Sequence, residues 1–80
     1  MHELGILNHA LRQVDKIAAA HHIPNVKAIT MEIGEHSGIV VDYLQKLFPI
    51  AASRFPCMEQ AELIISRSPG RELSIRDIQY

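Results

Sequence analysis

Apolar side chains recur at spacings of three and four through the first twenty residues of the chain. This is the period of an amphipathic helix that buries one face. The pattern ends near His21-His22, and Pro24-Asn25 interrupts the chain just beyond. We therefore predict a first helix over residues 3–21. The residues of its buried stripe are Leu4, Leu7, Leu11, Val14 and Ala18.

The period then changes to two. Residues 26–34 alternate apolar with smaller or polar side chains, which predicts a strand with one buried face. Residues 61–67 and 71–79 alternate in the same way, and the turn Ser68-Pro69-Gly70 lies between them. The alternation slips by one residue near Asp77, which indicates a bulge or the strand end. The predicted inward residues are Ile29, Met31, Ile33, Leu63, Ile65, Leu73 and Ile75.

A second helix is predicted over residues 40–54, after a turn that Gly34 and Gly38 bracket. Pro49 lies inside it and should kink or split it, because proline removes one backbone donor and crowds the preceding turn. The segment Phe55-Pro56-Cys57 should end the helix. Its predicted inward residues are Leu44, Leu47, Phe48 and Ala51.

The order α-β-α-β-β predicts an α/β fold of the two-layer α+β type, with a three-stranded mixed sheet and two helices on one face. We expect an antiparallel hairpin between the last two strands, because a short turn cannot make a parallel crossover. The first helix should pack on the inward face of the sheet through Leu4, Leu7, Leu11 and Val14. The chain has 80 residues, so residues 1–80 form one domain with a small core, and a homodimer would add a stabilising interface.

Composition excludes several classes of function. Eight Lys and Arg against nine Asp and Glu give a formal charge of −1, without the basic field that a nucleic-acid partner needs. No apolar run approaches the roughly 20 residues that cross a bilayer, and no secretory signal is visible, so we expect no membrane partner. Cys57 is the single cysteine, which excludes an intrachain disulfide and favours a soluble protein of a reducing, cytoplasmic compartment.

No catalytic motif accompanies this fold. Residues 34–38 lack the Lys-Ser or Lys-Thr pair of a phosphate-binding loop. Glu35, His36 and Ser37 are sequence neighbours, and neighbours seldom converge into a hydrolase triad. Cys57 lies in an apolar stretch, which is typical of an inert structural thiol. We therefore predict that the chain is not an enzyme.

Four of the five histidines favour a surface role. His9 lies on the polar flank of the first predicted helix, and His36 lies in the turn. His21 and His22 lie at the C-terminal end of that helix, where an imidazole complements the negative end of the helix dipole. An adjacent pair of histidines has the chemistry to bind a metal, but neighbouring side chains on a helix point about 100° apart.

His2 has a different chemistry because it is the second residue. The α-amine of Met1, the amide and imidazole of His2 and the amide of Glu3 place four nitrogens in one chelate. Amine, amide and imidazole donors in one plane suit a square-planar Ni(II) or Cu(II) ion. The carboxylate of Glu3 offers an additional oxygen donor. The alternative is a frayed terminus without a role.

Three segments together resemble the HypA (or HybF) family of hydrogenase nickel metallochaperones. They are the opening Met1-His2-Glu3-Leu4, the sequence MEIGEHSG at residues 31–38 and the sequence GRELSIRDI at residues 70–78. The strand at residues 61–65 is also similar to that of the family. The resemblance therefore spans almost the whole chain.

The resemblance implies that Met1, His2 and Glu3 form the Ni(II) site, with His2 as the indispensable ligand. It also implies delivery of nickel to the hydrogenase large subunit, in cooperation with the nickel GTPase of the same pathway. Some members of the family serve urease as well.

The chain also departs from the family pattern. The family's zinc domain, which has two Cys-x-x-Cys pairs between the last two strands, is absent at about residues 66–71, so we expect no bound zinc. Some members carry an acidic residue before the second helix, where this chain has Val40 and Val41 followed by Asp42.

These departures leave two alternatives to nickel delivery. One is a zinc-less paralogue that acts as a protein-interaction module without metal delivery, and the other is a small ligand-binding regulatory domain, which needs a pocket.

Overall fold

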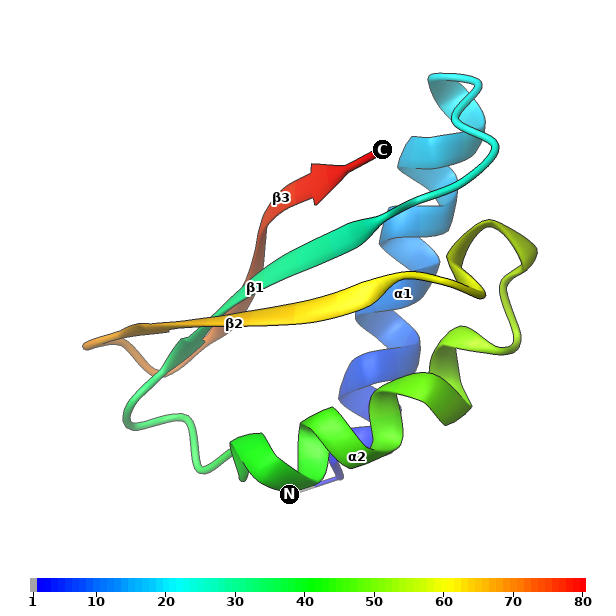
Figure 1. The fold of residues 1–80 in the computed structure, drawn as a ribbon. Helices are drawn as coiled ribbons and strands as arrows, with labels where there is room; N and C mark the ends of the chain where they lie inside the picture. Colours follow the sequence, from blue (N-terminus) through cyan, green and yellow to red (C-terminus); the bar gives the residue numbers. More distant parts are fainter. Residues whose placement is uncertain (1) are drawn as a thin grey trace.

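A computed structural model describes residues 2–80, and Met1 lies outside the described residues. The predicted element order and the α+β class are confirmed, and the predicted bounds differ from the observed ones by at most two residues. Figure 1 shows the arrangement. The elements are α1 (Glu3–Ala20), β1 (Ala28–Gly34), α2 (Val41–Ala52), the 3₁₀ helix η1 (Pro56–Met58), β2 (Glu62–Ser68) and β3 (Leu73–Gln79).

The central position of β1 shows that the predicted hairpin between the last two strands is wrong. The strand order is β2-β1-β3, in which β1 pairs parallel with β2 and antiparallel with β3. Every residue of β1 is buried or half-buried, so its backbone groups need partners on both edges. The short connection at residues 69–72 therefore crosses the end of β1 instead of folding back into a hairpin (Figure 1).

Backbone hydrogen bonds hold this crossing together. The amide of Gly34 donates to the carbonyl of Glu72 at 2.9 Å, and the amide of Glu35 donates to the carbonyl of Ser68 at 2.7 Å. A Cβ atom at Gly34 would overlap the carbonyl of Gly70. Glycine is therefore required at the end of β1, because the connection passes directly over its Cα atom.

The slip in alternation near Asp77 is a β-bulge, as one of the two sequence interpretations expected. Thr30 pairs with Asp77, whereas its neighbour Met31 pairs with Ile75, so Arg76 is the extra residue of β3. The guanidinium of Arg76 lies 3.5 Å from the carboxylate of Glu32. This ion pair lies on the face of the sheet that the helices leave open.

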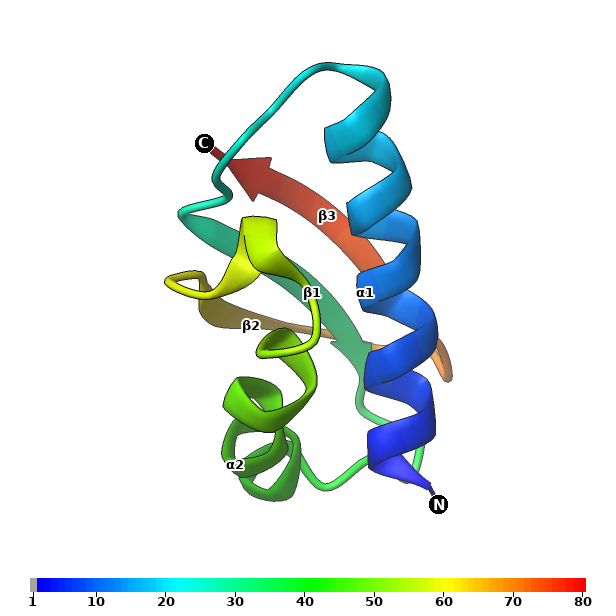
Figure 2. The ribbon, with the colours of Figure 1, turned by 90° about the vertical axis from the view of Figure 1, so that its right-hand side faces the viewer.

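α1 lies across one face of the sheet (Figures 1 and 2). The predicted contact through Leu4 is wrong, because Leu4 is 36% exposed whereas Glu3 is only 6% exposed. Position 3 fits the helical period as well as position 4, since it lies four residues before Leu7. The buried apolar residues of the helix are Leu7, Ala10, Leu11, Val14 and Ala18.

α2 packs against α1 near its N-terminal end and against the β2 side of the sheet (Figures 1 and 2). The side-chain amide of Gln45 donates to the carbonyl of Leu63 at 3.0 Å, which ties α2 to β2. Pro49 does not split α2, which continues to Ala52. Pro49 is exposed, so water can replace the backbone hydrogen bond that the proline removes.

The C-terminal end of α1 has a left-handed residue that is not glycine. His22 has a φ of 56°. Its amide donates to the carbonyl of Ala19 at 3.3 Å, and the amide of Ile23 donates to the carbonyl of Ala18 at 2.8 Å. These two hydrogen bonds form a Schellman motif, in which glycine usually occupies the left-handed position.

Gly34→Ala should lower the free energy of unfolding by roughly 2 kcal/mol or more, because the new methyl group forces the crossing connection away from β1. Urea denaturation checks this. Gly70→Ala is the matched control, since a Cβ there meets only the Oγ atom of Ser68 at 3.7 Å. Equal stability of the two variants would show that the close approach at Gly34 is wrong.

His22→Gly should raise the free energy of unfolding by about 1 kcal/mol, since glycine adopts the left-handed conformation without the steric cost of a Cβ atom. The same denaturation experiment measures the gain. His21→Gly is the control, because His21 has an ordinary φ of −102° and should lose stability. A loss of stability in both variants would contradict the assignment of the motif.

Candidate metal centre

His2 occupies the N-cap position of α1, and its side chain is exposed. Its φ of −92° and ψ of 82° are not helical, while its carbonyl accepts a hydrogen bond from the amide of Ile6 at 3.1 Å. The amide of Glu3, the next residue, lies in the first turn, where amides have no acceptor within the helix. Met1, the remaining member of the predicted chelate, lies outside the described residues.

His2 borders two hollows, one on each side of the first turn of α1. A groove of about 720 Å³ separates α1 from the start of β3. A second hollow, of about 510 Å³, lies between α1 and α2 and is lined by His2, Glu3, Asn8 and Tyr43 among others. Nothing in the hydrophobic pattern predicts the groove. Its lining includes His2, Ile6, His9 and Gln13 on the helix and Ser37, Ile39, Leu73 and Ile75 opposite.

His9 is exposed, as expected of a surface histidine, but it lines the same groove as His2. The spacing of seven residues places both on one face of α1. The Nε2 atom of His9 lies 3.4 Å from the Nε2 atom of Gln13. Sequence analysis missed this shared face, although the spacing of seven was a signal for it.

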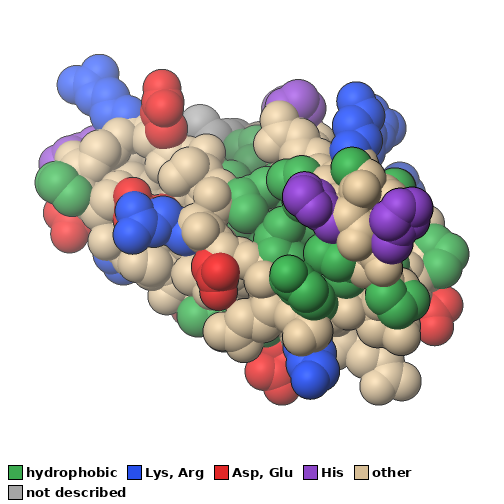
Figure 3. Space-filling model, turned by 90° about the horizontal axis from the view of Figure 1, so that it is seen from above, with side chains coloured by type: hydrophobic (Ala, Val, Ile, Leu, Met, Phe, Trp, Pro, Cys, Tyr) green, Lys and Arg blue, Asp and Glu red, His purple; other side chains and the backbone are tan. Residues whose placement is uncertain are grey.

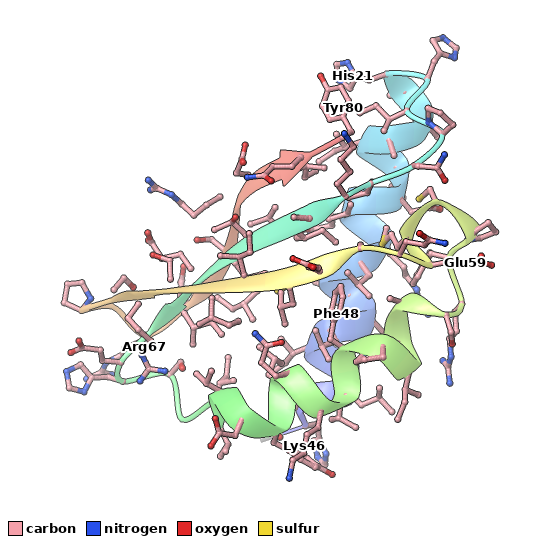
Figure 4. The ribbon with its side chains drawn as sticks, viewed as in Figure 1. His21, Lys46, Phe48, Glu59, Arg67 and Tyr80 are labelled. Carbon is pink, nitrogen blue, oxygen red and sulfur yellow. The ribbon has the colours of Figure 1, made fainter. Side chains whose placement is uncertain are left out.

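The other histidines lie elsewhere. His21 is at the opposite end of α1, roughly 28 Å from His2 at the rise of 1.5 Å per helical residue. Figure 3 shows histidine side chains among hydrophobic ones at that end of the molecule, and Figure 4 shows His21 and Tyr80 there, far from the start of α1. His36 is exposed in the turn after β1 and does not line the groove.

Side chains alone do not complete a metal site. Within residues 2–80, no three His, Cys, Asp or Glu side chains gather closely enough to hold a metal ion. The predicted donor set, which combines main-chain nitrogens with the imidazole of His2, does not need such a cluster.

The carboxylate of Glu3 is committed to a contact that the sequence did not predict. Its Oε2 atom accepts a hydrogen bond from the amide of Val40 at 3.3 Å. Val40 is the N-cap residue of α2, and its own side chain makes no capping hydrogen bond. The backbone amides of Glu3 and Val40 lower the pKa of the Glu3 carboxyl below its ordinary value of 4.5. The negative charge therefore lies beside the positive end of the α2 dipole.

Cys57 is not part of this centre. Its Sγ atom donates a hydrogen bond to the Oδ1 atom of Asp15 at 3.5 Å. Burial, together with Asp15, raises the pKa of the Cys57 thiol. The thiol stays protonated at neutral pH, which agrees with the structural role that its apolar sequence setting predicts.

Asn8 faces the α2 side of this turn of the helix. Its Oδ1 atom is buried and has no hydrogen-bond partner within the described part of the chain.

Neither α1 nor α2, the two α-helices of residues 2–80, combines the length and apolarity that would cross a membrane.

Comparisons of the sequence with a family model and with curated proteins all lead to one family. A family model described as "Hydrogenase/urease nickel incorporation, metallochaperone, hypA" matches residues 1–78. Similar proteins include a hydrogenase maturation factor HypA from Geobacter metallireducens, 38% identical over 71 residues, which are 89% of this chain and 61% of that protein. Another, from Chloroflexus aurantiacus, is 36% identical over 69 residues, which are 86% of this chain and 60% of that protein. The chain thus spans about three fifths of the length of the curated relatives it matches.

The fold is also that of a solved structure. The solution structure of the Ni metallochaperone HypA from Helicobacter pylori superposes with a TM-score of 0.79. The superposition covers 96% of this chain and 72% of that chain at 14% identity. At this identity, the likeness concerns the arrangement of helices and strands.

Metal-free protein should lose the stabilising effect of Glu3 as the pH falls. The pKa of Glu3 is lowered in the folded state, so the ionised form stabilises the fold above the ordinary value of 4.5, and the effect disappears as the pH falls below it. Urea denaturation from pH 7 to pH 3 should show wild type more stable than Glu3→Gln at pH 7, with a gap that closes in acid. A gap independent of pH would contradict this assignment.

Proposed function

Because this chain belongs to the HypA family, we propose that its N-terminus binds one Ni(II) ion and delivers it as cargo in the maturation of nickel-iron hydrogenase. The observation that carries the proposal is the family match over residues 1–78, which includes all three proposed ligand residues. The exposure of His2 at the start of α1 supports it.

The proposed ligands are four nitrogens from the first three residues. They are the α-amine of Met1, the amide and imidazole of His2 and the amide of Glu3. Successive donors close small chelate rings around one ion, and Ni(II) accepts such a planar set of nitrogens. The position of His2 outside the helical conformation supports this arrangement, because the Glu3 amide has no main-chain acceptor within α1 to give up.

A carrier of this kind binds and releases its ion without turnover, so we propose no catalytic role. Protons compete for the same lone pairs, and the affinity for nickel should therefore weaken in acid. The proposed acceptors are the hydrogenase large subunit and the nickel GTPase of the pathway, as the family resemblance implies. The direct connection between β2 and β3 at residues 69–72 supports the further proposal that no zinc domain is inserted there.

His2→Ala should weaken nickel binding about 100-fold or more, equivalent to about 2.8 kcal/mol. Adding one residue ahead of Met1 should have a similar effect, because it keeps every side chain and moves only the α-amine. Isothermal titration with nickel, together with metal analysis for nickel and zinc, measures the affinity and a stoichiometry of one ion per chain.

His9→Ala and His36→Ala are the matched controls, since each removes an imidazole that the proposed site does not use. Both should bind nickel as the wild type does. If the extended protein binds as tightly as the wild type, the terminal site is wrong, and a protein-interaction module without metal delivery becomes the better description.

A further inference from the structure

We infer that the Glu3 carboxylate is not a nickel ligand but positions the nickel-binding terminus by holding the first turn of α1 against the N-terminal end of α2. This inference rests on the proposed function and goes beyond it. Glu3 then has two roles, because its main-chain nitrogen is a proposed nickel ligand and its carboxylate accepts a hydrogen bond from the amide of Val40.

The location of the carboxylate is the first argument. The side chain of Glu3 is 6% exposed, whereas His2 is exposed. Consecutive side chains at the start of a helix point about 100° apart. If the carboxylate rotated outward to bind the same ion as the imidazole of His2, it would leave its buried position. It would also lose its 3.3 Å hydrogen bond with the amide of Val40.

The second argument is that the start of α2 needs a hydrogen-bond acceptor from elsewhere in the chain. The first amides of any helix lack acceptors within the helix, and a side chain usually supplies one. Val40 provides no such cap for α2, and Ser37 is engaged elsewhere because its Oγ atom accepts from the amide of Ile39 at 3.2 Å. Glu3, from 37 residues earlier in the chain, supplies the acceptor. Release of the carboxylate would leave a buried charge and an unpaired amide together.

The covalent link between the two roles is the third argument. The amide that nickel requires and the carboxylate that Val40 requires belong to one residue, so the contact restricts where the Glu3 amide can lie. Groups that orient a metal ligand without touching the metal typically contribute about 10-fold to 100-fold in affinity. By linkage, nickel and the contact with α2 must influence one another to the same extent.

The test compares Glu3→Ala, Glu3→Gln and Val40→Pro with the wild type. Glutamine keeps an oxygen that accepts from Val40, and alanine keeps none. Proline removes the amide of Val40 but leaves every proposed ligand in place, and the φ of −85° at this position is close to what proline adopts. Each protein is titrated with Ni(II), and the visible spectrum reports the coordination geometry. Urea denaturation of the metal-free proteins confirms that each variant folds.

Glu3→Gln should bind nickel with the wild-type spectrum and nearly the wild-type affinity. Glu3→Ala and Val40→Pro should each lose about 10-fold in affinity. In metal-free Glu3→Ala, the amide of Val40 should exchange its hydrogen faster than in the wild type. Glu59→Ala, which removes an exposed carboxylate beyond the C-terminal end of α2 (Figure 4), should change none of these quantities.

Two results would overturn the inference. If Glu3→Gln loses the wild-type spectrum, the carboxylate is itself a ligand. If Glu3→Ala or Val40→Pro binds nickel as tightly as the wild type, the contact does not position the site. His2→Ala, run beside them, tests the proposed function separately, because unchanged binding in that variant removes the terminal nickel site whatever the Glu3 variants show.

Discussion

The close approach of two backbone segments at Gly34 is the constraint on which the remaining arrangement depends. Every residue of β1 is buried or half-buried, and its backbone must be paired on both edges, so β2 and β3 flank it and their connection has to cross its end. The crossing fixes the residues around Arg71 opposite the first turns of α1. The groove beside His2 is therefore a product of strand order, although its lining comes from distant parts of the chain.

The same end of the molecule holds a buried charge. A carboxylate with so little exposure is unfavourable unless a donor pairs with it, and the uncapped start of α2 supplies that donor. Their hydrogen bond satisfies both groups and connects the first turn of α1 to the start of α2. The nickel-binding terminus proposed for this family member thus begins on a turn that is held from its buried side and open on the other.

Local patterns were enough to predict the elements but not all their neighbours. The spacing of Leu7, Leu11 and Val14 identifies α1, and the slip near Asp77 identifies the bulge, because both are properties of short segments. Strand order is not a property of a short segment, since a Ser-Pro-Gly turn leads equally well into a hairpin or across another strand. Position 3 rather than position 4 turned inward because the amide of Val40, 37 residues away, donates a hydrogen bond to the carboxylate of Glu3. Met58, fully buried in η1, stands in a segment too short to show a period.

The bulge at Arg76 bears on how the protein behaves at high concentration. An exposed strand edge is a template on which a second chain can add, and this sheet has two edges. The side chain of Gln45 occupies a carbonyl of β2 on one side. On the other edge, the extra residue Arg76 interrupts the regular pairing of β3 and increases its local twist. These features make it harder for a strand of a second chain to add to either edge of this small sheet.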